Sequence, residues 1–208
     1  MRFALFFALI VSILVGCSHA PTHTAGGYVT NLPQRPGAVP LVVPVYFDLS
    51  FTDSELLDLT AAFEEWNYAL NGAQVFRQEA FFDGAGGQKA VRALMARSLE
   101  GMIVIRRPTG DAGLEDVSPS ALAWVDSVCG DELNVAADRI GGRDLKTVVM
   151  HEIGHSMCIP HIPVIHTLMF PGYTGATGCI DRVTVQVLST LRPHTFDWHT
   201  MNYCERPL

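Results

Sequence analysis

The sequence predicts a single α+β domain of mixed α/β type, and three observations lead to this fold class. Short runs rich in Val, Ile, Leu, Phe and Tyr alternate with stretches of helical periodicity between residues 39 and 191. A capping box opens one of the helical stretches. An N-terminal leader of 16 residues leaves 192 of the 208 residues, which suits one domain with a substantial core.

Five strands are expected from apolar runs bounded by turn-forming residues. They lie at residues 39–51, 75–82, 101–107, 121–125 and 133–137. Pro44 lacks a backbone N–H and interrupts the first run. The glycine-rich residues 83–87 are expected to form a loop, because they lack the context and spacing of a phosphate-binding motif.

Helical periodicity indicates four helices. They cover about residues 53–70, 88–99, 145–155 and 182–191. The first begins at the capping box Thr52-Asp53-Ser54-Glu55 and ends at Asn71-Gly72. The second has packing as its expected role, with an inward face of Val91, Leu94, Met95 and Leu99.

The N-terminus has the pattern of a targeting segment. Arg2 precedes an almost wholly apolar run, residues 3–15, which is short for a membrane span. The following Leu14-Val15-Gly16-Cys17 resembles the bacterial lipobox, which implies cleavage before Cys17 and lipid on its thiol and new amino group. An ordinary secretory signal with an incidental cysteine, or an uncleaved anchor, would be the alternatives.

This interpretation divides the chain into three parts. Residues 1–16 form the signal peptide, residues 17–38 the lipidated cysteine with a flexible tether, and residues 39–208 the domain. The expected location is the bacterial cell envelope, facing the periplasm or the surface. Ser18 after the cysteine resembles lipoproteins of the outer membrane.

The net charge argues against two classes of binding partner. The formal net charge of −7 and the scarcity of Lys and Arg clusters argue against nucleic acid and anionic lipid as partners. Contact with the membrane is therefore expected only through the N-terminal lipid.

An even number of cysteines in an exported domain fits two disulfides, although buried thiols are an alternative. These cysteines are Cys129, Cys158, Cys179 and Cys204.

The strongest functional motif is H-E-x-x-H-x-x-x-x-x-H at residues 151–161. His151 and His155 are four residues apart, so a helix presents both imidazoles on one face to one metal ion. His161 can return as a third nitrogen ligand if the chain turns after the helix. Three protein ligands with a water form the open coordination of a catalytic zinc. Glu152 is placed to take a proton from that water.

Together with the segment Thr167–Tyr173, this motif resembles the metzincin metallopeptidases, and the matrixins most closely. Matrixins carry a Met-aromatic-Pro-x-Tyr segment at their Met-turn, which Met169–Tyr173 matches, eight residues after His161. The resemblance implies a five-stranded mixed sheet with three main helices, and a zinc cleft between a larger N-terminal and a small C-terminal subdomain. It also implies that Met169 lies beneath the imidazoles without ligating. Elsewhere in residues 39–204 the resemblance is only one of element order.

The resemblance also implies where a substrate would bind. The strand at 121–125 would be the antiparallel edge above the cleft and would pair with an extended polypeptide by strand addition. The residues expected to contact substrate there are Ala121, Leu122, Ala123 and Trp124. The wall of the S1′ pocket would be Pro171, Gly172 and Tyr173.

One position departs from the family pattern. The family has a glycine, usually at positive φ, where this chain has Cys158, and a non-glycine residue costs about 1 kcal/mol in that conformation. We expect a disulfide from Cys158 to compensate. By the resemblance, the loop with Cys129 lies near the end of the zinc helix, and Cys179 and Cys204 bracket the last helix. The favoured pairs are therefore Cys129–Cys158 and Cys179–Cys204.

Further metal sites are not expected. Gly130–Asn134 echoes a matrixin loop that holds structural ions, but the histidine ligand expected there is Leu133, so a second zinc is not predicted. Calcium is possible but unsupported, because solvated carboxylates are the default interpretation of Asp111, Glu115, Asp116, Asp131 and Asp138. The remaining polar candidates, interpreted as surface or structural residues, are His166, His194, Asp197 and His199.

These observations predict a monomeric, zinc-dependent metalloendopeptidase that hydrolyses polypeptides with a metal-activated water. Glu152 would take the proton of that water and pass it to the leaving amine. A non-catalytic zinc-binding envelope lipoprotein, acting as an adhesin or binding module, is the first alternative. A structural envelope lipoprotein with a fortuitous motif is the second.

Overall fold

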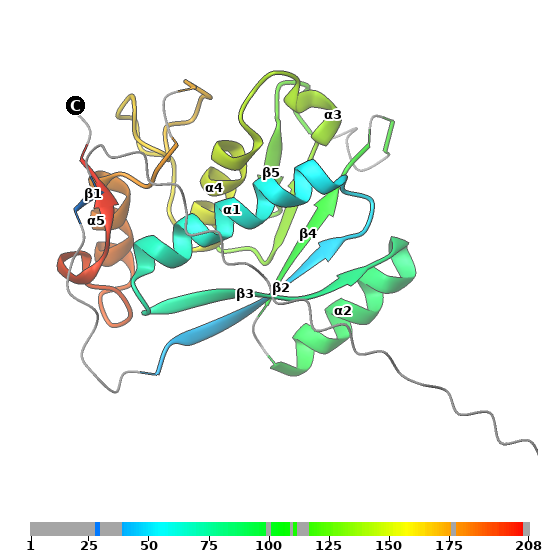
Figure 1. The fold of residues 1–208 in the computed structure, drawn as a ribbon, viewed down its shortest axis with the longest axis horizontal. Helices are drawn as coiled ribbons and strands as arrows, with labels where there is room; N and C mark the ends of the chain where they lie inside the picture. Colours follow the sequence, from blue (N-terminus) through cyan, green and yellow to red (C-terminus); the bar gives the residue numbers. More distant parts are fainter. Residues whose placement is uncertain are drawn as a thin grey trace, which may run out of the picture.

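The computed structural model describes residues 28–29, 39–98, 101–108, 110–111, 117–175 and 178–205. Within these residues the chain forms a five-stranded mixed sheet, five α-helices and a separate pair of short strands (Figure 1). The expectation of an α+β chain with a five-stranded mixed sheet is confirmed.

The large sheet has the strand order β3-β2-β4-β6-β5. Its strands are β2 (Leu41–Asp48), β3 (Gln74–Phe82), β4 (Met102–Arg106), β5 (Ala123–Val125) and β6 (Glu132–Val135). Four strands run parallel, whereas β5 lies at one edge and runs antiparallel to β6. At Pro44 the strand β2 pairs with β3 alone, because its pairing with β4 begins at Val45. The missing N–H of Pro44 is therefore tolerated inside a long strand.

The helices are α1 (Asp53–Leu70), α2 (Gly84–Ser98), α3 (Ala137–Ile140), α4 (Leu145–Ser156) and α5 (Arg182–Leu191), followed by a 3₁₀ turn at Trp198–Thr200. The predicted capping box opens α1: the Thr52 hydroxyl accepts from the Glu55 N–H, and the Glu55 carboxylate accepts from the Thr52 N–H. Asn71, at φ 47°, ends the helix in the left-handed conformation.

The helices cover both faces of the sheet. α1 and α4 lie on one face, and α2 lies on the other (Figure 1). The larger core is on the face of α1 and α4, and Trp66 at its centre is fully buried. The Trp66 indole donates a 2.9 Å hydrogen bond to the carbonyl oxygen of Met150, which fixes α4 against α1. The helix that carries His151 and His155 is therefore held at its middle by the core.

The structure differs from the sequence expectation at the start of α2. This helix begins at Gly84, so the glycine-rich run expected as a loop forms its first turn, and the Gly87 N–H donates to the Asp83 carbonyl. Glycine has low helix propensity, but Val91 and Met95 are buried against the sheet, and this packing extends the helix backwards. Leu94 is half exposed, contrary to its expected inward position, and Leu99 lies outside the described residues.

A second difference concerns the expected tether. Tyr28–Val29 form a short strand, β1, which pairs antiparallel with β7 (Tyr203–Cys204). A two-residue strand is too short to show periodicity, so this strand could not be predicted from the sequence. Cys17 and the signal segment lie outside the described residues. In the described segments no helix combines the length and apolar character needed to cross a membrane.

Candidate metal centre

The three histidines of the motif meet in space. His151 and His155 lie one turn apart on α4, and the chain then turns so that His161 faces them. One ring nitrogen from each histidine lies within 4.8 Å of the others, and the ring centroids are 4.7 to 5.3 Å apart. This cluster could hold a metal ion, as the spacing of the motif predicts.

Two of the imidazoles are oriented by backbone carbonyls. The Nδ1 atom of His151 lies 2.7 Å from the carbonyl oxygen of Leu168, and that of His155 lies 2.7 Å from the carbonyl oxygen of Ile159. A carbonyl oxygen can only accept, so each Nδ1 carries the proton, and each Nε2 keeps its lone pair for a metal.

Burial keeps these imidazoles neutral. It lowers the pKa of His151 to about 4, despite the opposing hydrogen bond to Leu168, and it also lowers the pKa of His155. Metal ligation requires neutral imidazole, so the unliganded site already has these two donors in the correct protonation state at neutral pH.

Glu152 lies on the same helix, next to His151 of the cluster, and is buried. Burial raises the pKa of Glu152 to about 7, although a hydrogen bond from the backbone N–H of Val125 opposes this shift. A carboxyl group that titrates near neutral pH can both accept and return a proton. The donor, Val125, belongs to the edge strand β5, so the carboxyl group is tied to this strand.

The turn between α4 and His161 has the features that were predicted from Cys158, which stands where the family has a glycine. Cys158 has φ 76°, the conformation that normally favours glycine, and it forms a disulfide with Cys129 at φ 70°. The backbone N–H groups of both cysteines donate to the carbonyl oxygen of His155, at 2.9 and 2.8 Å. The bridge thus closes the end of α4. The second predicted disulfide, Cys179–Cys204, is also present.

Met169 packs against α4, the helix of His151 and His155. It is fully buried, and a Cβ atom added at Gly154 would overlap its sulfur and approach its Cε to 2.9 Å. Gly154 on α4 therefore makes room for the methionine. The Met169 carbonyl accepts a 2.8 Å hydrogen bond from the Ile162 N–H, which connects the Met-turn to the residue after His161.

Asp181 is a supporting residue that the sequence interpretation missed. Its buried carboxylate accepts hydrogen bonds from the Leu168 N–H at 2.6 Å and from the Thr184 N–H at 2.9 Å. It therefore caps α5 and also fixes Leu168, whose carbonyl oxygen orients His151. An Asp just before a helix, with Thr three residues later, is an N-cap pattern. The sequence could therefore have indicated that Asp181 caps α5, but not that it also bonds Leu168.

The expected substrate residues fall into two groups. On the edge of the sheet, β5 contains only Ala123–Val125, so the observed strand begins later than the expected strand at 121–125. Ala121 follows a turn in which its N–H donates to the Ser118 carbonyl, and the Leu122 carbonyl accepts from the Ala136 N–H at 2.9 Å. The first bond closes a turn before the strand, whereas the second continues the β5–β6 register by one residue, so Leu122 still pairs with β6 and Ala121 does not. Trp124 lies within β5.

The second group follows the Met-turn. Pro171, Gly172 and Tyr173 are exposed. The Tyr173 hydroxyl accepts a 2.8 Å hydrogen bond from the Asp144 N–H at the start of α4. The segment after Met169 is thereby fixed to the helix that contains His151 and His155.

Two of the calcium candidates form ion pairs. Asp111 pairs with Arg107, and Asp138 pairs with Arg106. Asp131 is exposed, whereas Glu115 and Asp116 lie outside the described residues. Leu133 is fully buried in β6. His166, His194 and His199 are exposed, in line with the interpretation of these residues as surface residues.

No protein-family model matches this sequence, and no curated protein matches it.

Proposed function

We propose that this chain is a zinc-dependent endopeptidase of the metzincin type, close to the matrixins. The observation that carries the proposal is the juxtaposition of three imidazoles, whose ring nitrogens lie within 4.8 Å of one another, with a buried carboxyl group whose pKa is about 7. A site that serves only to hold a metal has no use for such a carboxyl group, whereas hydrolysis needs a general base.

The donor set suits zinc. Three neutral imidazole nitrogens leave the fourth position of a tetrahedral site open, and two of the three are oriented by carbonyl oxygens as metal-bound histidines usually are. Zinc bound there would supply Lewis-acid activation of a water molecule and of the scissile carbonyl.

The residues of the chain would divide the remaining work. Glu152 would accept the proton of the attacking water and transfer it to the leaving amine. The backbone of β5 would pair with an extended substrate. Tyr173, held to the start of α4, would place the segment 171–173 as a wall of the pocket beside the scissile bond. In this arrangement the cleft separates a larger N-terminal part, with the sheet, from a small part that contains α5.

The proposal includes attachment to the cell envelope through lipid on Cys17, with a polypeptide as substrate and the monomer as the active form. The support for attachment is the sequence Leu14-Val15-Gly16-Cys17 after an apolar run.

The test is metal analysis together with cleavage of unfolded protein. The purified chain is depleted of metal, titrated with zinc, and assayed with a reduced, carboxamidomethylated protein as substrate. We expect one zinc per chain and zinc-dependent cleavage. His161→Ala should lose both, whereas His194→Ala, which removes an exposed histidine outside the cluster, should lose neither.

Two outcomes would contradict the proposal in different ways. Absence of bound zinc after reconstitution would exclude the metal site itself. One zinc per chain without cleavage of any unfolded protein would instead favour the non-catalytic binding module.

A further inference from the structure

The edge strand β5 is short, and polar side chains beside it contribute to its position. It pairs with β6 through Ala123–Val125. On the face of the sheet that α2 covers, β6 presents two buried polar side chains, those of Glu132 and Asn134. The intervening Leu133 and the following Val135 face the larger core instead. Buried polar groups need hydrogen-bond partners, and the partners of Asn134 connect β6 with β5.

The Asn134 amide connects the residue after β4 with the residue after β5. Its Oδ1 atom accepts a 2.7 Å hydrogen bond from the Arg107 Nε–H, and its Nδ2–H donates a 3.0 Å bond to the Asp126 carboxylate. Asn134 is 1% exposed, so water does not compete for these bonds. Arg107 also pairs with the Glu132 carboxylate, which Arg92 of α2 contacts as well. An ion-pair network therefore holds one end of the amide, and Asp126 bonds the other.

Asp126 is next to the residue that bonds the proposed catalytic carboxyl group. Its own N–H donates to the Glu132 carbonyl at 3.3 Å, so it continues the pairing of β5 with β6. Backbone groups alternate in direction along a strand, so the N–H of Val125 points to the free edge of the sheet. It donates there to the carboxyl group of Glu152 on α4. The bonds that hold Asp126 to β6 therefore determine where the Val125 N–H meets Glu152.

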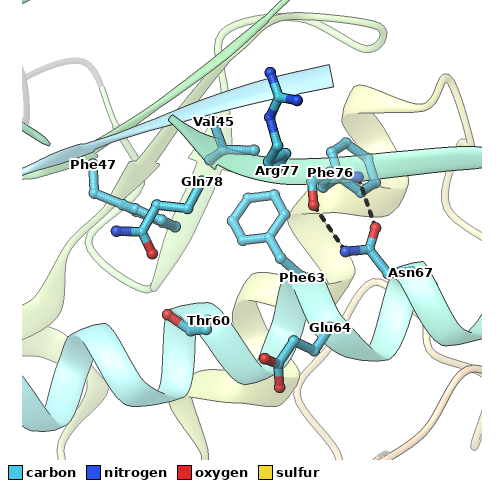
Figure 2. A pocket seen from close by; sticks show the side chains of 9 residues that line it. All are labelled: Val45, Phe47, Thr60, Phe63, Glu64, Asn67, Phe76, Arg77 and Gln78. Atoms are coloured by element: carbon cyan, nitrogen blue, oxygen red, sulfur yellow. Dashed lines mark hydrogen bonds between the residues drawn. The ribbon is translucent and has the colours of Figure 1, made fainter. Parts of the chain in front are cut away.

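An asparagine also fixes the opposite edge of the sheet, without this connection. Asn67 of α1 accepts from the Phe76 N–H at 2.7 Å and donates to the Phe76 carbonyl at 2.8 Å, so it holds β3 against α1 (Figure 2). The two edges of the sheet are β3 and β5. Asn67 is therefore a matched comparison, because it stabilises an edge strand that does not bond Glu152.

We propose that Asn134 is a positioning residue for Glu152: through Asp126 it holds β5 so that the Val125 N–H orients the carboxyl group. The consequence for catalysis rests on the proposed peptidase function, whereas the series of bonds from Asn134 to Glu152 does not. A displacement of β5 by about 1 Å would misplace the general base, and a displacement of that size can lower a rate by roughly a hundredfold.

Two substitutions break the bond between Asn134 and Asp126 from its two ends. Asp126→Ala removes an exposed side chain and should fold. Asn134→Asp keeps an acceptor for Arg107 but places a second carboxylate against that of Asp126.

Two further variants test rescue of this bond. Asp126→Asn is conservative, because its amide oxygen still accepts from Asn134. In the double variant Asn134→Asp/Asp126→Asn, the amide at position 126 can donate to the carboxylate at position 134. The bond is then restored with its direction reversed, which completes a double-mutant cycle.

Each disrupting variant has a matched control. Asp131→Ala removes another exposed carboxylate from the loop between β5 and β6 and is compared with Asp126→Ala. Asn67→Asp removes the donor to the Phe76 carbonyl at the opposite edge and is compared with Asn134→Asp. A general loss of stability would affect both members of the second pair.

The first readout is hydrogen exchange of the Val125 amide in the full chain, without substrate. Amides inside α4 report global opening and serve as the reference. Relative to them, Val125 should exchange roughly tenfold faster or more in Asp126→Ala and Asn134→Asp, as in Glu152→Ala, which lacks the acceptor. Asp126→Asn, the double variant and both controls should keep the parent rate.

The second readout is cleavage of an eight-residue peptide by chains reconstituted with zinc. In Asp126→Ala and Asn134→Asp, kcat should fall by roughly tenfold or more, while one zinc per chain remains bound. The double variant should recover kcat, and the controls should not lose it. If Asn134→Asp does not fold, Asp126→Ala and Asp126→Asn complete the comparison alone.

Parent exchange rates at Val125 in the disrupting variants would overturn the proposal, and so would equal acceleration in Asn67→Asp. Unchanged kcat in these variants of an active parent would also overturn it. If the parent cleaves no peptide but Val125 exchange follows the expected pattern, the peptidase function is wrong and the positioning of Glu152 by Asn134 stands. If the parent is active and the exchange pattern is absent, the reverse holds.

Discussion

At the scale of single residues, the carboxyl group of Glu152 shows how placement creates a reactive group. The same glutamate in water would titrate near 4.3, which is too acidic for a base that must also return its proton at neutral pH. Burial raises its pKa to about 7, while one backbone N–H from Val125 keeps it oriented. Because two opposing contributions set this pKa, the sequence alone could predict the residue but not its titration range.

Glu152→Ala tests this role. The histidines and their carbonyl partners are untouched, so the variant should fold and bind one zinc. Cleavage of unfolded protein should fall by about 10²–10⁴-fold, which is the usual contribution of general acid–base catalysis. Glu205→Ala, at an exposed glutamate near the C-terminus, is the control and should retain full activity. Full activity in Glu152→Ala would remove this glutamate from the mechanism.

Gly154 has a role that is purely steric. A methyl group at this position would collide with the sulfur of Met169, which is fully buried and has little room to move. Gly154→Ala should therefore destabilise the fold by about 1–3 kcal/mol. It should also weaken zinc binding, since a displaced Met169 would shift the neighbouring Leu168, whose carbonyl oxygen orients His151. Gly86→Ala in α2 meets no atom within 4 Å and should be neutral or slightly stabilising. Chemical unfolding and a zinc-competition assay compare the two variants, and equal behaviour would contradict this account.

At the scale of secondary-structure elements, local signals were reliable where they were strong. The capping box fixed the start of α1, and Asn71 fixed its end. The position of Cys158, where glycine was expected, correctly indicated a positive φ and a disulfide. The sequence could not show contacts between distant segments: the pairing of β1 with β7, or the hydrogen bond from Leu168 to Asp181. The start of α2 was predicted incorrectly because tertiary packing outweighed the propensity of its glycines.

The disulfide that closes α4 should couple stability to metal affinity. Replacing Cys129 and Cys158 together by serine removes the bridge that holds the turn before His161. We expect a loss of about 2–4 kcal/mol in unfolding free energy, together with weaker zinc binding. The Cys179–Cys204 disulfide closes a loop of similar length, with a separation of 25 rather than 29 residues. Replacing both of these cysteines by serine should cost comparable stability, with a smaller effect on zinc. Equal losses of zinc affinity in both variants would contradict the assigned role.

The start of α1 should contribute stability that depends on pH. Burial raises the pKa of Glu55, but hydrogen bonds from Arg106 and Thr52 outweigh this effect and hold the pKa below its ordinary value. The contribution of Glu55 is therefore fully present above its unfolded pKa of about 4.3 and is lost as the pH falls through the lower folded value. The difference in unfolding free energy between the parent and Glu55→Gln should shrink below about pH 4. A difference that stays constant with pH would show that the ion pair with Arg106 contributes nothing.

At the scale of the whole molecule, the fold brings the histidine cluster to one edge of the sheet. The backbone N–H of Val125, in the antiparallel edge strand β5, bonds the carboxyl group of Glu152 on α4. In the proposed peptidase, backbone groups at this edge would be available to an extended polypeptide.

In the proposed lipid-anchored form, β1 limits the distance between the domain and the membrane. If Cys17 carries lipid, the chain has only residues 18–27 between the anchor and the strand Tyr28–Val29, which is paired with β7. At about 3.3–3.6 Å per fully extended residue, this strand lies within about 40 Å of the membrane surface. A tether that ended at residue 38 would have allowed nearly twice that distance. The proposed peptidase would therefore act on polypeptides close to the membrane.

Cys17→Ser tests the anchor on which this geometry depends. The parent chain, produced in a bacterium that processes lipoproteins, should incorporate labelled fatty acid and sediment with the membrane fraction. The variant has no thiol to acylate, so it should lose the label and either appear in the soluble fraction or remain unprocessed. Cys179→Ser is the control for the loss of a cysteine, because that residue forms a disulfide within the domain and should not affect labelling. A parent chain that incorporates no fatty acid would exclude the lipid anchor and, with it, the distance limit set by β1.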